Sequence, residues 1–166
     1  MPAPDELDID GPVTAEVFVV TRTEQGLALT GPDGPQPWLL QTIDAGHPMA
    51  LVESLVRRHL PEATLVHSTS WRYDQGRVVL SFLAVVPEHT VAGLPSVPID
   101  RAVLARGSAH EAPADVAWPA VLEHGLRHLA WLAKDDEAVV AALDQGWHDV
   151  LHGYVPAPFQ HLGGPT

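Results

Sequence analysis

The stretch HPMALVESLVRRHLP, residues 47–61, has the pattern of one amphipathic helix. Its apolar residues recur at the i, i+3, i+4 spacing of a single helical face, and the other face is polar. Pro48 suits the first turn, and Pro61 ends the helix because a proline disfavours helical backbone in the residue before it. Glu53 and Arg57 lie four residues apart in the order that favours an ion pair. We therefore predict a helix here that buries one face.

Apolar and β-branched runs on both sides of this helix predict strands. The strands are expected at residues 14–22, 26–30, 37–41, 63–73, 77–86 and 99–106, and further helices at 118–133 and 135–152. The clearest hairpin turns at Asp74-Gln75-Gly76. Asp135 is the expected N-cap of the last helix. This mixture of strands and helices places the chain in the α/β class.

The length of 166 residues fits one domain that can bury a core of its own. We expect an acidic, proline-rich mobile tail over residues 1–12, a single domain over 13–154 and an irregular tail over 155–166. The absence of cysteine excludes disulfides and thiolate chemistry. No signal-peptide pattern and no run of about 20 apolar residues is present, so a cytoplasmic protein without a membrane partner is expected.

The net charge of −12 would repel a polyanion such as DNA. We therefore expect no nucleic acid polymer among the partners. A small anionic molecule remains a candidate ligand, because a local arginine cluster can override the overall sign. The sequence leaves the oligomeric state open, with a homodimer as the commonest alternative to a monomer.

The order of elements resembles that of the Nudix hydrolase family over roughly residues 14–90. Trp38-Leu39-Leu40 stands where the family has a Trp-x-Leu stretch before a loop, and Gly46 stands near the loop glycine. Leu55 matches the buried leucine of the family's helix. The resemblance implies a Nudix-like α/β/α sandwich with a mixed β-sheet and C-terminal helices.

The polar positions of the helix depart from the family pattern. Ser54 stands where the family has a glutamate, and Arg57 and Arg58 stand where it has a glutamate pair. The family uses these glutamates to hold divalent metals against a diphosphate, and arginine repels such cations. The resemblance therefore implies a degenerate site without Mg²⁺-dependent hydrolysis, and no cofactor is predicted.

Five residues are candidates for binding a small anionic or nucleotide-like ligand. Arginine binds phosphate through two parallel hydrogen bonds, and tryptophan stacks on bases. The candidates are Arg57, Arg58, Arg72, Trp38 and Trp71. The alternative interpretation is that Arg57 pairs with Glu53 in solvent and that the tryptophans fill the core. Core filling is our expectation for the remaining tryptophans, Trp118, Trp131 and Trp147.

Two other functions remain open. In an active hydrolase with relocated ligands, Mg²⁺ or Mn²⁺ would be held by carboxylates such as Asp44, Glu53, Glu88 or Glu123. In a histidine-based metal protein, the ligands would be two pairs with i, i+4 spacing on the C-terminal helices. These pairs are His124 with His128 and His148 with His152. His128 is also a candidate for a core histidine, since it lies beside an apolar stripe. A third role, as a structural or regulatory protein, needs neither metal nor catalysis.

Overall fold

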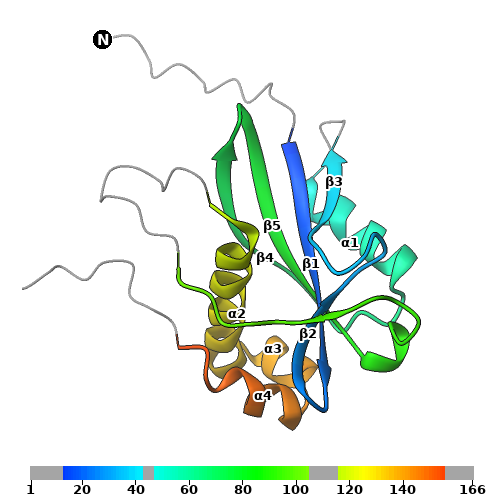
Figure 1. Cartoon of the computed structure of the whole chain (residues 1–166), viewed down its shortest axis with the longest axis vertical. Helices are drawn as coiled ribbons and strands as arrows, with labels where there is room; N and C mark the ends of the chain where they lie inside the picture. The colour runs from blue at the N-terminus through cyan, green and yellow to red at the C-terminus, as the bar shows by residue number, and fades with distance from the viewer. Residues whose placement is uncertain (1–12, 43–46, 105–115, 156–166) are drawn as a thin grey trace, which may run out of the picture.

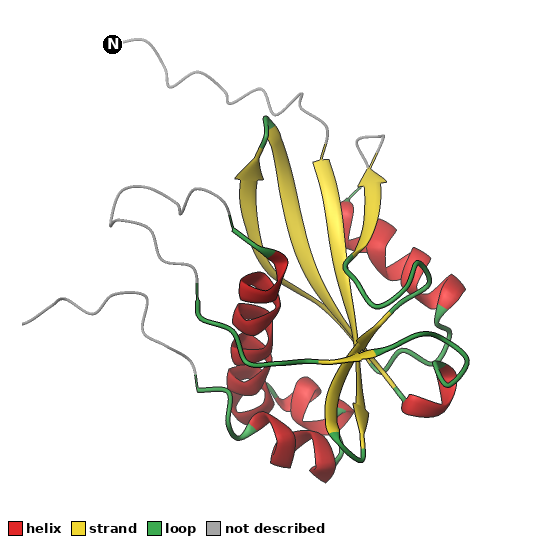
Figure 2. Ribbon diagram, in the orientation of Figure 1, coloured by secondary structure: helices red, strands yellow, loops and turns green. Residues whose placement is uncertain are grey.

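The computed structural model describes residues 13–42, 47–104 and 116–155. In this part of the chain a six-stranded mixed sheet has one helix on one face and three helices on the other (Figures 1 and 2). The predicted α/β/α sandwich is therefore confirmed. The expected terminal tails fall outside the described residues, apart from the first residue of the C-terminal one. Within the described ranges, no helix has both the length and the apolar character to cross a membrane.

Most elements lie within three residues of their predicted bounds. The strands are β1 (Val13–Thr23), β2 (Gly26–Thr30), β3 (Trp38–Thr42), β4 (Leu65–Asp74), β5 (Arg77–Val86) and β6 (Val97–Pro98). The helices are α1 (Pro48–His59), the 3₁₀ turn η1 (Glu88–Thr90), α2 (Trp118–Asp135), α3 (Glu137–Ala142) and α4 (Gln145–Leu151).

The long strand β1 organises the sheet. It pairs in parallel with β5 along one side, and on the other side its two halves pair antiparallel with β3 and β2. The main path of the sheet runs β4-β5-β1-β2-β6, so β4 is an edge strand. Successive side chains of β1 point to opposite faces: Val17 and Val19 lie on the α1 face, and Phe18 and Val20 lie on the α2 face.

Each face of the sheet has its own apolar core. On one face, α1 buries Val52, Val56 and the following Leu60, as its periodicity predicts. On the other face, α2 buries the stripe that includes Leu122, Leu126 and Leu129. Burial of these stripes, at roughly 25 cal/mol per Å² of apolar surface, is what fixes the three layers.

The predicted helix over 135–152 is wrong, because the chain breaks there into α3 and α4. Leu143 has extended backbone and is buried in the core, and this ends α3. Asp144 then accepts a hydrogen bond from the backbone N–H of Trp147 and caps α4. The predicted N-cap is also displaced by one residue, since Asp135 ends α2 and Asp136 caps α3.

The predicted strand over 99–106 is wrong for the residues that are described, up to Leu104. Sheet pairing is confined to the two residues of β6, and the backbone N–H of Ile99 makes one further bond to Leu27 O. The chain then leaves the sheet edge, because the Arg101 side chain is held by Glu123 of α2. An ion pair to a helix thus takes the place of a strand ladder.

Candidate functional site

The polar surface of α1 carries an ion pair and a further cation. Arg57 Nη2 donates to Glu53 Oε1 at 2.9 Å, and both side chains are exposed. Arg58 is exposed beside them, and it has no ion pair within the described residues. The predicted pairing of Glu53 with Arg57 is confirmed, whereas anion binding by the two arginines stays a prediction.

Trp38 lies in the core beneath α1. It is 6% exposed and belongs to the apolar cluster that contains Val52 and Val56. Its ring meets His59 edge-on, with the ring centroids 5.2 Å apart. The packing of Trp38 therefore matches the core-filling alternative, with little of the ring free for a base.

Trp71 and Arg72 project to opposite faces of β4. Trp71 and Tyr73 are each 70% exposed. Arg72 points inward and forms a two-pronged ion pair with Glu16 on β1, with one Nη2–Oε2 distance of 2.9 Å. Ser81 Oγ donates to the same carboxylate at 2.7 Å, so these polar groups link three strands.

The five predicted ligand residues do not gather at one place. Arg57 and Arg58 lie in the last turn of α1, close in sequence to the start of β4 at Leu65. Trp71 lies six residues further along that strand, about 20 Å away at the usual rise per residue. The burial of Trp38 and the pairing of Arg72 with Glu16 do not favour one pocket built from all five residues, and ligand binding by them stays a prediction.

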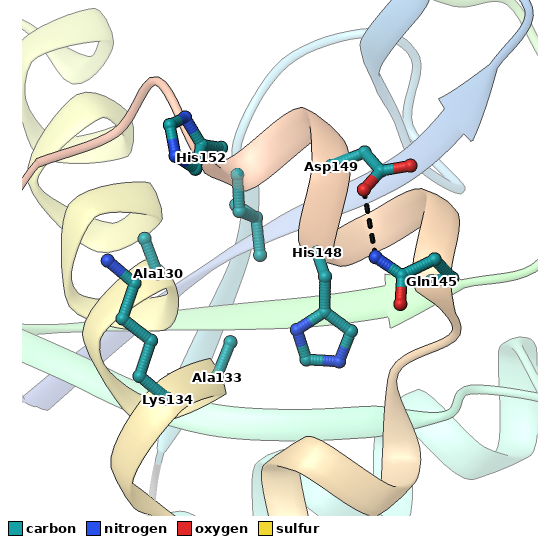
Figure 3. Close-up of a pocket in the computed structure, with 8 residues that line it drawn as sticks. Ala130, Ala133, Lys134, Gln145, His148, Asp149 and His152 are labelled. Carbon is teal, nitrogen blue, oxygen red and sulfur yellow. Dashed lines mark hydrogen bonds between the residues drawn. The ribbon is translucent and has the colours of Figure 1, made fainter.

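An open groove lies between α2 and α4. It has a volume of about 460 Å³, within the size range of small-molecule sites. Figure 3 shows the groove and its side chains. It is lined by Ala130, Ala133, Lys134, Gln145, His148, Asp149, Leu151 and His152.

The groove brings one cation, one carboxylate and two imidazoles together. Lys134 is the one lysine in the chain, and it makes no ion pair within the described ranges. His148, on α4, and His152, at the C-cap of this helix, lie on the opposite wall. Asp149 is engaged by Gln145, whose Nε2 donates to Asp149 Oδ1 at 2.9 Å. The groove combines hydrogen-bond donors with apolar side chains. The sequence did not predict this groove, because residues 135–152 were expected to form one continuous helix instead of α3 and α4.

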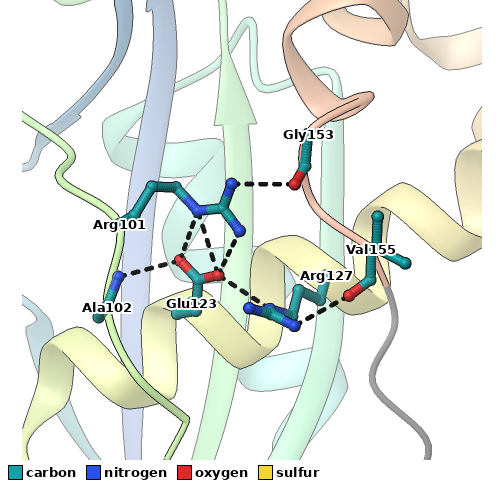
Figure 4. A network of polar contacts seen from close by, with 6 residues as sticks. All are labelled: Arg101, Ala102, Glu123, Arg127, Gly153 and Val155. Carbon is teal, nitrogen blue, oxygen red and sulfur yellow. Dashed lines mark hydrogen bonds and ion pairs between the residues drawn. The ribbon is translucent and has the colours of Figure 1, made fainter.

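Glu123 of α2 is 1% exposed, and both of its carboxylate oxygens accept hydrogen bonds (Figure 4). Arg101 grips both of its oxygens, with an Nη2–Oε1 distance of 2.8 Å, and Arg127 Nε donates to Oε1 at 2.8 Å. The backbone N–H of Ala102 adds a further bond at 3.2 Å. Burial by itself raises the pKa of Glu123, but the bonds from Arg101 and Arg127 outweigh it and hold the pKa below its usual range.

This arrangement bears on the relocated-ligand alternative. The Glu123 carboxylate already has four donors from the protein, so its lone pairs are taken. Glu53 is bound to Arg57, Glu88 is exposed at the start of η1, and Asp44 falls outside the described residues. These carboxylates do not converge on one point, and that alternative stays a prediction without a geometric site.

The histidine pairs predicted from spacing do not meet each other. His128 instead faces His67 of β4, with 3.2 Å between their Nε2 atoms. His148 and His152 line the groove on α4. Across the described ranges no three side chains of His, Asp, Glu or Cys are grouped so that they could hold a metal. The His67 contact spans 61 residues of sequence, and no local pattern signals it.

The tryptophans expected in the core divide into two groups. Trp147 is 6% exposed, as predicted. Trp118 and Trp131 are 40% and 47% exposed, so core filling is wrong for both. Trp118 lies at the first residue of α2, with one side against Phe18, and Trp131 lies on the outward face of the same helix.

Comparisons with known proteins show similarity at the level of structure. No family model and no curated protein sequence matches the chain. Two crystal structures of Shewanella oneidensis NrtR do match. The one described as complexed with a 27mer DNA has a TM-score of 0.53 and 13% identity, covering 87% of this chain and 77% of that chain. The other NrtR structure has a TM-score of 0.52 and 14% identity, covering 89% and 79%.

At such low identity, these matches show the fold alone. They agree with the layers, the mixed sheet and the C-terminal helices described above. Because one of the matching structures is a DNA complex, the expectation that nucleic acid is excluded has no support from these comparisons. The chain has a Nudix-like fold.

Proposed function

We propose that this chain is a binding domain for a small organic anion and that it lacks metal-dependent diphosphate hydrolysis. The observation that carries the proposal is the groove between α2 and α4, where Lys134 makes no ion pair within the described ranges and lies across from His148 and His152. In a chain with a net charge of −12, an unpaired cation beside two further donors favours an anionic ligand. A volume of about 460 Å³ suits a molecule the size of a nucleotide or a sugar phosphate.

The surface of α1 supports the absence of hydrolysis. Mg²⁺ in a hydrolase needs carboxylates that are free to coordinate it beside the diphosphate. Here the one carboxylate of α1, Glu53, is bound by Arg57, and Arg58 adds another positive charge next to it. A divalent cation would have to displace Arg57 and then bind against the charge of both arginines.

The binding experiment compares two single cations. We would titrate the full chain with pyrophosphate and with ADP by calorimetry, in EDTA. The variants are Lys134→Gln and the matched control Arg58→Gln, because each removes one exposed cation that lacks an ion pair within the described residues. A charge-assisted bond contributes about 1.5–3 kcal/mol, so Lys134→Gln should weaken binding about tenfold or more. Arg58→Gln should leave the affinity within about twofold, a change below 0.5 kcal/mol.

If only Arg58→Gln weakened the binding of the probes, the anion site would lie on α1, and this result would refute the groove as the site. Absence of binding to either probe would refute small-anion binding itself. For hydrolysis, the chain would be assayed with nucleotides, nucleotide sugars and dinucleotides in Mg²⁺, Mn²⁺ and EDTA. Turnover that needs the metal would overturn the second half of the proposal.

A second candidate function is nucleic acid binding, which the NrtR–DNA structure favours. The electrostatics of the C-terminal helices oppose it. From Trp118 to Leu151 the chain carries six carboxylates and two cations, Arg127 and Lys134, and Arg127 is already bound to Glu123. Phosphate contacts from Lys and Arg supply most of the affinity for DNA. We expect no binding to a fluorescent 27-base-pair duplex at low salt, and salt-dependent binding there would make this second function the better one.

A further inference from the structure

His67 and His128 form a contact between an edge strand and a helix. His67 lies on β4, and His128 lies on α2, which packs over that face of the sheet. Their Nε2 atoms are 3.2 Å apart, and their ring centroids are 5.2 Å apart with only 16° between the planes. The two rings are therefore nearly parallel, and they approach each other through the same nitrogen of each.

Both imidazoles are partly buried, and burial favours their neutral form. Burial lowers the pKa of His128, and burial together with the charge of His128 lowers the pKa of His67. Asp136, at the start of α3, opposes this at His67. On the helix side, His128 also packs against the ring of Trp131, with the ring centroids 5.7 Å apart. A neutral imidazole is the form that binds a metal.

We propose that His67 and His128 form a two-imidazole site for a divalent transition metal ion such as Zn²⁺, which would clip α2 to β4. The geometry carries this assignment. Two histidine nitrogens that each lie about 2.0–2.1 Å from one zinc ion in a tetrahedral arrangement are about 3.3 Å apart, close to the distance between these two Nε2 atoms. A hard ion such as Mg²⁺, which prefers oxygen ligands, would not bind there.

Water completes the coordination sphere at this site. In the described part of the chain no third His, Asp or Glu side chain joins the pair to make a three-ligand group. The affinity is therefore below that of four-ligand structural zinc sites. Both ligands come from the folded chain at positions 61 residues apart, so the metal binds the folded state and stabilises it by mass action.

The same two nitrogens could instead share a proton in a neutral N–H···N hydrogen bond. That arrangement would stabilise the contact without any metal. The two possibilities differ in their response to zinc, because a shared proton gives no dependence of stability on the metal concentration.

The test is a thermal-unfolding series on the full chain with ZnCl₂ or NiCl₂ as the probe and MgCl₂ as the negative control. Wild type should gain several degrees in melting temperature at a hundred times the dissociation constant of the metal. His67→Ala and His128→Ala should each lose that gain. The matched control is the double variant His148→Ala/His152→Ala, which removes a histidine pair on one helix face and should keep the full gain.

Calorimetry with ZnCl₂ gives a second readout that does not depend on how stable each variant is. It should report about one zinc per chain for wild type and for the control, and none at comparable affinity for His67→Ala. A melting temperature of wild type that is unchanged by both metals would overturn the proposal in favour of a shared proton. A gain that survives His67→Ala but is lost in His148→Ala/His152→Ala would assign the metal to α4 and also overturn it.

Discussion

Two glutamate–arginine pairs with identical spacing differ widely in their surroundings. Glu53–Arg57 on α1 and Glu123–Arg127 on α2 are both i, i+4 pairs with glutamate first. The Glu53 side chain is 42% exposed, whereas that of Glu123 is 1% exposed. The spacing is the same in both helices, but the contribution of each contact to stability depends on what the rest of the fold places over it.

Two segments pack over the Glu123 carboxylate: the one after β6, which contains Arg101, and the one after α4, which contains Gly153 and Val155. Arg101, in the segment after β6, binds Glu123 and also donates through Nη1 to Gly153 O at 2.9 Å. Its guanidinium lies 4.1 Å from the centre of the Tyr154 ring, in cation–π geometry. Arg127 Nη1 donates to Val155 O at 3.0 Å. One buried carboxylate thus joins α2 to two segments that have no regular structure of their own.

The largest expected effect follows from Glu123→Gln. This change keeps the volume of the side chain but removes the charge that holds Arg101 and Arg127. Breaking a buried ion pair costs about 3–5 kcal/mol, and the half-exposed Arg101 can recover some hydration, so we expect about 3 kcal/mol. The measurement is urea unfolding followed by tryptophan fluorescence. A loss below 1 kcal/mol would mean that burial gives this pair no more weight than its counterpart on α1.

Acid should remove the same contribution in the wild type. The pKa of Glu123 is lowered in the folded protein, so its stabilisation is present above the unfolded pKa, near 4.5, and is lost as the pH falls through the folded value. The difference in unfolding free energy between wild type and Glu123→Gln should therefore shrink from pH 6 towards pH 3. Subtracting the variant removes most of the titration of the other carboxylates. A difference that is constant over this range would contradict a lowered pKa.

The sequence predicted what depends on local periodicity. The apolar face of α1 repeats within a few residues and buries Val52 and Val56, and the continuous apolar, β-branched run of β1 is buried on both faces of the sheet. The contacts that matter for a site were out of reach, because they join distant positions: His67 with His128 across 61 residues, and Arg72 with Glu16 across 56. Spacing along one helix paired His128 with His124, whereas the fold gave it a partner on β4.

The predicted ligand residues failed to gather for the same reason. Arg72 was chosen because arginine binds phosphate, but pleating turns it towards Glu16, while its neighbour Trp71 faces solvent. Which face of an edge strand is outward depends on register across the sheet, and the strand's own sequence, LVHSTSWRYD, does not alternate clearly enough to reveal it. The groove beside Lys134 depends on the break between α3 and α4 at Leu143. The apolar pattern continues through this break, and its local signal in the sequence is Asp144, which caps α4.

A smaller effect is expected for Arg127→Gln. Glu123 would keep the two-pronged bond to Arg101 and the N–H of Ala102, so its charge would remain compensated. The variant loses one charge-assisted bond and the contact to Val155 O, which together suggest a cost of about 1.5–2 kcal/mol. Urea unfolding measures it, with Arg127→Lys as the companion. Lysine cannot reproduce both bonds from one planar group, and full rescue by Arg127→Lys would contradict a role for that geometry.

The smallest effect belongs to the α1 pair, and a double-mutant cycle on Glu53→Gln and Arg57→Gln measures it. The coupling energy should be about 0.3–0.5 kcal/mol, as for other exposed i, i+4 pairs, and it should fall further in 0.5 M NaCl because exposed charges are screened. The same cycle on Glu123 and Arg127 should give at least about 1 kcal/mol and respond less to salt, since the carboxylate is buried. Equal coupling in the two cycles would show that helix spacing, rather than the segments packed over α2, sets the strength of both pairs.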